Sequence, residues 1–521
     1  MTLDSHEGPA PGAPLSVYVR MYRALEAKRE YKGLLGDCFL IRLVRAGVQS
    51  TILIDCGMLL GSPNATARMR MIASDIVAAT GGDLAEGRAG NLDLLVVTHE
   101  HWDHISGFSQ AGDIFLDPKK LKIANLWMAW TENPDEPDAN ALHKRFDKSG
   151  AAFAALAERL TRESARFGAD AVGRALSGLE GFLGATAAGG GRLTGRDIMD
   201  ALKALGKETG PDQTCVRFLT PGEVHQTPGA NALRAFVLGP PTDHALLFMS
   251  DPSKGSAQET YLDSPLVDGG QILRFSEGAD PDPRADSPFA AQYCRIPAKG
   301  LDGPSGDEET ADGDVSRWLR ARYYVLPGAD AATDASNARR RIDTDWLGAA
   351  GPMALKLDSD TNNTSLVLAF DLPDDTVMLF AADAQVGNWL SWHKQDYIDE
   401  TGRTHKASEL LGRTRFYKVG HHGSHNATLD AQGLGLMTRD DLVAAIPTDE
   451  DLGKRQGASG WQMPNPRVKA ALMERTAGRI MRNDRLYDPA SRKNDHELCS
   501  VDPAFFERLT EQDLYLEYRV I

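Results

Sequence analysis

The stretch Leu94-Leu95-Val96-Val97-Thr98-His99-Glu100-His101-Trp102-Asp103-His104 joins an apolar run of strand length to three histidines and an aspartate. Alternate residues of a strand share a face, so His99 and His101 at its carboxyl end can approach one cation. Where the chain turns into a following helix, Asp103 and His104 can reach a second cation. Such spacing rarely arises by chance, and it predicts a metal-dependent protein.

Two later strands end in residues that could complete a site for two ions. Asp383 follows the apolar run 377–382, where its carboxylate could bridge two cations; the alternative is an ordinary turn residue. His421 and His422 follow the run 416–420. We expect one of these histidines to bind a cation, while the other donates a hydrogen bond or orients its neighbour.

Apolar runs of strand length recur in both halves of the 521-residue chain. This pattern predicts α/β layers built from both halves, in one catalytic domain at 15–485 whose core covers about 15–115, 215–245 and 355–485. The predicted strands are 15–22, 38–44, 51–55, 92–97, 216–219, 233–238, 364–370, 376–382, 415–419, 442–446, 478–481 and 514–520.

Three stretches differ from this pattern. Residues 120–210 are predicted to be a mainly helical insertion, because apolar residues within 151–183 follow helical spacing. Residues 250–355 are predicted to be a second, irregular insertion. Residues 486–521 are expected to add a helix and a strand as a C-terminal extension. Either insertion could be a lid or a surface that binds a protein partner.

The formal net charge of −16 and the pI near 5.3 argue against non-specific coating of nucleic acid, which relies on clustered Lys and Arg. A polyanionic substrate would have to meet a local basic patch or the metal itself. Two candidate patches lie in the irregular insertion, and the alternative for each is a solvated helix face. They are Arg317, Arg320 and Arg322, and the run 339–341.

Five cysteines without a CxxC pair indicate neither a disulfide framework nor a zinc ribbon. The polar first 14 residues lack the apolar segment of a signal peptide. No uncharged run approaches the ~20 residues needed to cross a bilayer. We therefore expect a cytoplasmic protein without membrane contact.

The motif at 98–104 resembles the HxHxDH signature of the metallo-β-lactamase superfamily. Four further segments resemble one branch of this superfamily, the ComEC-type branch, which is named for the hydrolase domain of the DNA-uptake channel. The resemblance implies a four-layer αββα sandwich with two divalent ions, usually zinc and sometimes manganese. The four segments are Gly36–Ile41, Thr51–Gly57, Asn362–Leu368 and Lys418–Ser424.

This resemblance also implies roles for individual residues. Among seven candidate ligands, His99 and His101 would bind one ion, and Asp103 and His104 would bind the other. Asp383 would bridge both ions, and His421 or His422 would complete the set. Asp55 would orient the motif, and Asp37 would either line the site or only form a turn. The seven candidates are His99, His101, Asp103, His104, Asp383, His421 and His422.

A dinuclear centre can lower the pKa of bound water from ~15.7 to about 7, which makes hydroxide available at neutral pH. The expected reaction is attack of this hydroxide on a phosphodiester, with Asp103 and Asp383 as catalytic residues that position the nucleophile. The substrate would be nucleic acid, a nucleotide or another phosphodiester. One alternative is a carboxylic-ester, lactone or amide hydrolase with the same metals. Another is a non-catalytic binding or regulatory module, against which the retained ligands argue.

Substrate contacts are less determined than the ligands. The segment 461–466 lacks the histidine of the Asn-x-x-Gly-His-Pro sequence that the branch often carries. His225 and His244 lack the flanking sequence of ligands and are expected in loops or at the surface. The candidate substrate contacts, each with a structural role as the alternative, are Lys418, Ser424, His425 and Asp37.

Overall fold

The computed structural model describes residues 13–23, 33–147, 194–207, 213–250, 359–455 and 461–521. The helices and strands below belong to one compact unit made of Met1–Lys144, Gly181–Val267 and Asp358–Ile521. The helix expected within 151–183, the irregular insertion beyond residue 250 and both arginine clusters lie outside the described residues. In the described ranges, no helix combines the length and apolar character needed to cross a membrane.

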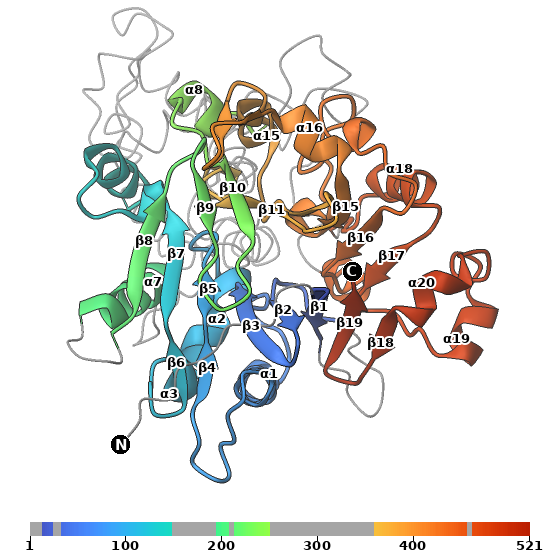
Figure 1. The fold of residues 1–521 in the computed structure, drawn as a ribbon, viewed down its shortest axis with the longest axis horizontal. Helices are drawn as coiled ribbons and strands as arrows, with labels where there is room; N and C mark the ends of the chain where they lie inside the picture. Colours follow the sequence, from blue (N-terminus) through green and yellow to red (C-terminus); the bar gives the residue numbers. More distant parts are fainter. Residues whose placement is uncertain (1–12, 24–32, 148–193, 208–212, 251–358, 456–460) are drawn as a thin grey trace, which may run out of the picture. The chain divides into compact units, whose positions relative to one another are not determined.

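The first sheet has eight strands, rich in the β-branched and aromatic residues that suit a buried, pleated surface (Figure 1). In sheet order they are β18 (Leu509–Glu511), β19 (Tyr515–Arg519), β1 (Ser16–Tyr22), β2 (Phe39–Arg45), β3 (Val48–Ile54), β5 (Leu94–Val96), β7 (Asn125–Ala129) and β8 (Cys215–Leu219). The pairs from β18 to β3 are antiparallel, whereas β3, β5, β7 and β8 are parallel.

The second sheet has seven strands and the same mixed character. In sheet order they are β17 (Ile480–Arg482), β16 (Val443–Ile446), β15 (Thr414–Lys418), β12 (Val377–Phe380), β11 (Val367–Asp371), β10 (Arg234–Gly239) and β9 (Val224–Gln226). The strands from β17 to β12 are parallel, and those from β12 to β9 are antiparallel. Two small sheets pair β4 (Gly90–Leu92) with β6 (Leu121–Ile123), and β13 (Tyr397–Ile398) with β14 (Thr404–His405).

The two sheets pack face to face, because one hydrophobic core takes side chains from both. Ile54 of β3 and Phe380 of β12 face this shared core, whereas their neighbours Leu53 and Leu379 face outer helices. The predicted four-layer αββα sandwich is therefore confirmed. The first sheet is covered by α1 (Ala65–Ala79), α2 (Trp102–Gln110), α3 (Gly112–Phe115) and α7 (Gly195–Ala204), and the second by α15 (Val386–Trp392), α16 (Ala407–Gly412) and α18 (Pro466–Thr476).

The described structure also contains shorter helical segments. They include η1 (Trp130–Glu132), η2 (Leu205–Lys207), α8 (His244–Leu247), η4 (Gly420–Gly423), η5 (Leu434–Leu436), α17 (Glu450–Gly453), α19 (Pro489–Asn494) and α20 (Pro503–Glu507). Residues 137–147 and 359–362 are helical as well.

Two ranges differ from the expectation from sequence. Residues 120–210 begin with β6 and β7, and β7 lies within the first sheet, so the sheet extends past the expected start of the insertion. The described residues beyond β7 include helix at 137–147 and α7, and the mainly helical insertion stays a prediction. A short, continuous apolar run such as Leu126–Ala129 does not distinguish a buried strand from a buried helix. Residues 486–521 contribute two short helices and two strands, and β19 pairs with β1, which makes this end a part of the first sheet.

Close backbone contacts hold the loop after β5, which carries the histidine motif. The amide of Asp37 donates to the carbonyl of Asp103 (3.0 Å), and the amide of Cys56 donates to that of His104 (2.8 Å). This approach requires a glycine at position 57, because a Cβ there would lie 2.5 Å from the carbonyl oxygen of Asp103. The motif is thus fixed by the two loops that flank β2 and β3.

We predict that Gly57→Ala lowers the free energy of unfolding by about 1–3 kcal/mol, because the added methyl group displaces the motif backbone. The midpoint of urea denaturation measures this change. Gly112→Ala is the control, since its Cβ would meet only a side-chain atom of Leu116 at 3.7 Å. Equal midpoints for the two variants would contradict the close approach.

Candidate metal centre

The candidate site lies where the parallel strands of both sheets end. Asp55 follows β3 and the histidine motif follows β5 in the first sheet. Asp383 follows β12, and His421 and His422 follow β15 in the second sheet. Ligand sites in α/β proteins commonly form at the carboxyl ends of parallel strands. The fold therefore brings together side chains that lie more than 300 residues apart in the sequence.

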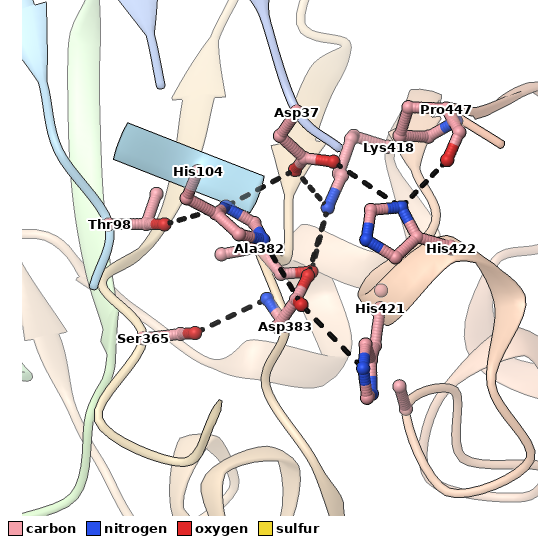
Figure 2. Close-up of polar contacts among 12 residues, drawn as sticks. Asp37, Thr98, His104, Ser365, Ala382, Asp383, Lys418, His421, His422 and Pro447 are labelled. Atoms are coloured by element: carbon pink, nitrogen blue, oxygen red, sulfur yellow. Dashed lines mark hydrogen bonds and ion pairs between the residues drawn. The ribbon is translucent and has the colours of Figure 1, made fainter. Parts of the chain in front are cut away.

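Four side chains form the tightest group of potential ligands. One ligand atom from each of Asp37, His104, Asp383 and His422 lies within 4.8 Å of the other three (Figure 2). Nε2 of His104 lies 3.1 Å from Oδ2 of Asp383 and 3.9 Å from Oδ2 of Asp103. Nε2 of His422 lies 2.9 Å from Oδ2 of Asp103.

Contacts made by Nδ1 determine which ring nitrogen His104 and His422 turn toward the group. Nδ1 of His104 lies 2.8 Å from a carboxylate oxygen of Asp55, and Nδ1 of His422 lies 2.7 Å from the carbonyl oxygen of Pro447. A carbonyl or carboxylate oxygen accepts a proton from Nδ1, which leaves Nε2 as the metal-binding nitrogen. Both rings thus present Nε2 to the carboxylates of Asp103 and Asp383.

His99 and His101 form a pair beside this group, with 3.0 Å between Nε2 of His99 and Nδ1 of His101. Nδ1 of His99 lies 3.1 Å from the hydroxyl of Thr98, which donates in turn to Asp55 (2.7 Å). The Thr98 hydroxyl therefore accepts from Nδ1 of His99, and Nε2 is left to face His101. Asp55 supports both His99 and His104, in agreement with an orienting role.

The turn after β15 has an uncommon backbone conformation. His421 (φ 43°) and His422 (φ 52°) are both left-handed, and so are Asp55 and Ala382. Such conformations cost of order 1–3 kcal/mol each and occur often at functional sites. They bring both His421 and His422 to the wall of one pocket. The structure thus places both histidines at the site, where the sequence favoured one.

This pocket has a polar and an apolar wall. The polar wall consists of His101, Asp103, Asp383, His421 and His422. The apolar wall consists of Leu35, Leu59, Trp102, Trp461 and Met463. Potential ligands therefore meet an accessible space that has an apolar side.

The donor set fits divalent cations. Three buried atoms of the tight group make no hydrogen bond with any described residue: Nε2 of His104, Oδ2 of Asp383 and Oδ1 of Asp37. Buried polar atoms without partners are rare, and imidazole nitrogens with carboxylate oxygens are typical zinc ligands. A cation held by Nε2 of His104 and Oδ2 of Asp383 would satisfy these two atoms.

The charges of the group are strongly coupled. Burial alone would lower the pKa of His104, but the carboxylates around it, Asp383 foremost, raise it well above its usual range. The pKa of His422 is likewise raised against the effect of burial, chiefly by its hydrogen bond to Asp103. By contrast, burial lowers the pKa of His421 to about 4.

Four residues were predicted as substrate contacts, and none of them lines the pocket. The ammonium of Lys418 is buried against Asp37 and Asp383. Ser424 donates to Asn426 (3.1 Å). His425 is half-buried beside Ser424. The contacts of Lys418 and Ser424 fit structural roles, and contact of these residues with substrate stays a prediction.

A second group of potential ligands, Glu100, Glu132 and His143, lies within 4.8 Å. Arg196 of α7 pairs with Glu100 (2.8 Å) and Lys203 lies 3.5 Å from Glu132. Because these cations already balance the carboxylates, we interpret this group as an ion-pair network that anchors α7 to the motif. The two histidines expected away from the site lie outside both groups: His225, in β9, pairs with Glu223, and His244 is exposed at the start of α8.

Several contributors to the site carried little signal in the sequence. Ser365, whose hydroxyl lies 3.3 Å from Nδ1 of His99 and accepts from the amide of Asp383 (3.2 Å), lies within the segment Asn362–Leu368, which resembles the ComEC-type branch but indicated no role for this serine. Pro447 acts through its carbonyl oxygen, which any residue could supply. Trp461 and Met463 fall in the segment where the sequence lacked the expected histidine. For these two, spatial proximity was the missing information.

A four-layer sandwich with histidines and aspartates at its strand ends has the architecture of a metal-dependent hydrolase. Residues 31–180 match the family model of the metallo-beta-lactamase superfamily, whose members are mostly hydrolases of this kind. No curated protein matches the chain. The match concerns the superfamily as a whole, so similarity to the ComEC-type branch stays a prediction.

We predict that Zn²⁺ binding at pH 7 releases protons. The raised pKa values favour the protonated forms of His104 and His422 in the ion-free protein, and a cation at Nε2 must displace those protons. Affinity should therefore rise with pH through this range. Calorimetry in two buffers of different ionisation enthalpy measures the release, with His244→Ala as control. A binding enthalpy that is the same in both buffers would contradict the prediction.

Proposed function

We propose that the chain is a dinuclear metal-dependent phosphodiesterase. The observation that carries the proposal is the convergence of ligands from both sheets around Asp383. Nε2 of His104 lies 3.1 Å and Nε2 of His421 lies 3.9 Å from Oδ2 of Asp383. The ring of His99, which pairs with His101, adjoins that of His104 (centroids 4.2 Å apart), and His422 pairs with Asp103. This is more donor groups than one four-coordinate ion uses.

The residues of the chain have distinct roles in this proposal. His99, His101 and His421 would hold one ion, Asp103, His104 and His422 the other, and Asp383 would bridge both. When bound, two divalent cations supply a water of lowered pKa and stabilise the negative charge of an in-line displacement. Asp103 and Asp383 accept hydrogen bonds and would orient the attacking water. Zinc suits the mixed imidazole and carboxylate set, and manganese is the alternative.

The apolar wall supports a small substrate with an apolar or aromatic group beside the scissile phosphate. Trp102 and Trp461 can contact the flat face of a nucleobase or an aryl group. No lysine or arginine is among the described residues that line the pocket. A nucleoside or aryl phosphodiester therefore fits better than long nucleic acid, whose binding relies on many phosphate contacts.

We predict metal-dependent hydrolysis of bis-p-nitrophenyl phosphate, with much slower hydrolysis of p-nitrophenyl butyrate. Asp383→Asn should lower kcat/KM about 100-fold or more, equal to about 2.7 kcal/mol, because it removes the bridging charge. Asp396→Asn, at an exposed ion pair, is the matched control. Faster cleavage of the butyrate would favour the carboxylic-ester alternative, and equal activity of the two variants would remove Asp383 from the mechanism.

We also predict that Trp461→Ala changes kcat/KM to different extents for two phosphodiesters with the same leaving group. The variant should lower kcat/KM about tenfold for bis-p-nitrophenyl phosphate, since one stacking contact contributes about 1–3 kcal/mol. Methyl p-nitrophenyl phosphate, which lacks the second ring, should be affected less. Ile398→Ala, at an exposed apolar residue, serves as control. An equal loss for both substrates would contradict the proposed aromatic contact.

A further inference from the structure

Among the described residues, one buried ammonium lies near the candidate centre. It belongs to Lys418, the last residue of β15. Its Nζ donates to the carbonyl oxygen of Ala382 (2.9 Å), contacts Oδ2 of Asp37, and lies 3.5 Å from Oδ1 of Asp383 (Figure 2). The side chains of Lys418, Asp37 and Asp383 are each at most 2% exposed. The ammonium thus lies behind Asp383, away from the pocket.

The two oxygens of Asp383 have different surroundings. Oδ1 faces Lys418 at 3.5 Å, whereas Oδ2 faces Nε2 of His104 (3.1 Å) and Nε2 of His421 (3.9 Å). Lys418 also binds the carbonyl of Ala382, whose left-handed backbone (φ 48°) directs the chain into Asp383. One ammonium therefore restrains both the backbone and the carboxylate plane of the proposed bridging residue.

We propose that Lys418 is a positioning residue: it holds Oδ1 of Asp383 so that Oδ2 is presented to the metal ions, and Asp37 is the counter-ion that holds Lys418. This inference rests on the proposed dinuclear centre. It gives Asp37 and Lys418 a role that differs from substrate contact. It also explains why a lysine is buried beside potential metal ligands, where a positive charge by itself would repel cations.

A test of Lys418 has to keep the net charge of the site unchanged. Lys418→Met alone removes a positive charge, which would strengthen cation binding and mask a loss of positioning, and it strands Asp37 as a buried charge. The double variant Asp37→Asn/Lys418→Met removes one charge of each sign and keeps the net charge. The matched control is Asp396→Asn/Lys406→Met, which makes the same exchange at an exposed pair.

Zn²⁺ affinity of the full-length, chelator-treated chain is measured by competition with a chromophoric chelator, alongside kcat and KM for bis-p-nitrophenyl phosphate. We expect the double variant to bind Zn²⁺ about 10–100-fold more weakly, as is typical when a partner that orients a metal ligand is lost. The urea midpoint should stay near that of wild type, and kcat should fall more than KM changes. The control should match wild type in every measurement.

Wild-type Zn²⁺ affinity and kcat in a folded double variant would overturn the proposal, because the pair would then serve folding alone. If that variant does not fold, Asp37→Asn/Lys418→Gln carries the test, since glutamine supplies neither the charge nor the reach of lysine. Equal affinity of that variant and wild type would also overturn the proposal. Failure of wild type to bind Zn²⁺ would instead contradict the dinuclear centre, so the two failures are distinguishable.

Discussion

The imidazole of His104 lies among four carboxylates, and the architecture of the site depends on how their charge is compensated. Asp55 and Asp383 lie within 3.1 Å of the ring nitrogens, and Asp37 and Asp103 within 3.9 Å. Burial of several carboxylates in one place is unfavourable unless cations or donors accompany them. One ammonium, that of Lys418, and the donors of Thr98 compensate part of this charge. The remainder favours the binding of divalent cations.

The αββα sandwich allows this concentration of charge because both sheets direct the ends of parallel strands to the same edge. Hydrophobic side chains fill the space between the sheets, including Ile54 and Phe380 just before the site. Asp55 follows Ile54 directly, and Asp383 follows Phe380 after two alanines. The boundary between core and site is therefore one or two residues wide on each strand. A rigid core next to the ligands limits their movement, as precise metal geometry requires.

Much of the sandwich could be predicted because its strands are continuous apolar runs that end in polar residues, as at 94–104. The strand at Asn125–Ala129 was missed because a short buried strand has no periodicity of its own. The predicted ligands lie together at one edge. They could be found in the sequence because the end of a strand is a local feature. The link from Lys418 to Asp37 was not predictable, because it joins residues 381 positions apart whose neighbours give no sign of pairing.

Metal binding in this arrangement is coupled to the stability of the sandwich. Asp103 and His104 lie in α2, which packs on the first sheet, whereas Asp383 and His422 follow β12 and β15 of the second. A cation held by all four would link the two sheets at the edge where the shared core ends. Because the ligand set does not exist in the unfolded chain, the free energy of binding adds to that of folding. The carboxylates that pair with His104 and His422 in the ion-free protein would then also bind the cation, so folding and metal binding depend on one set of charges.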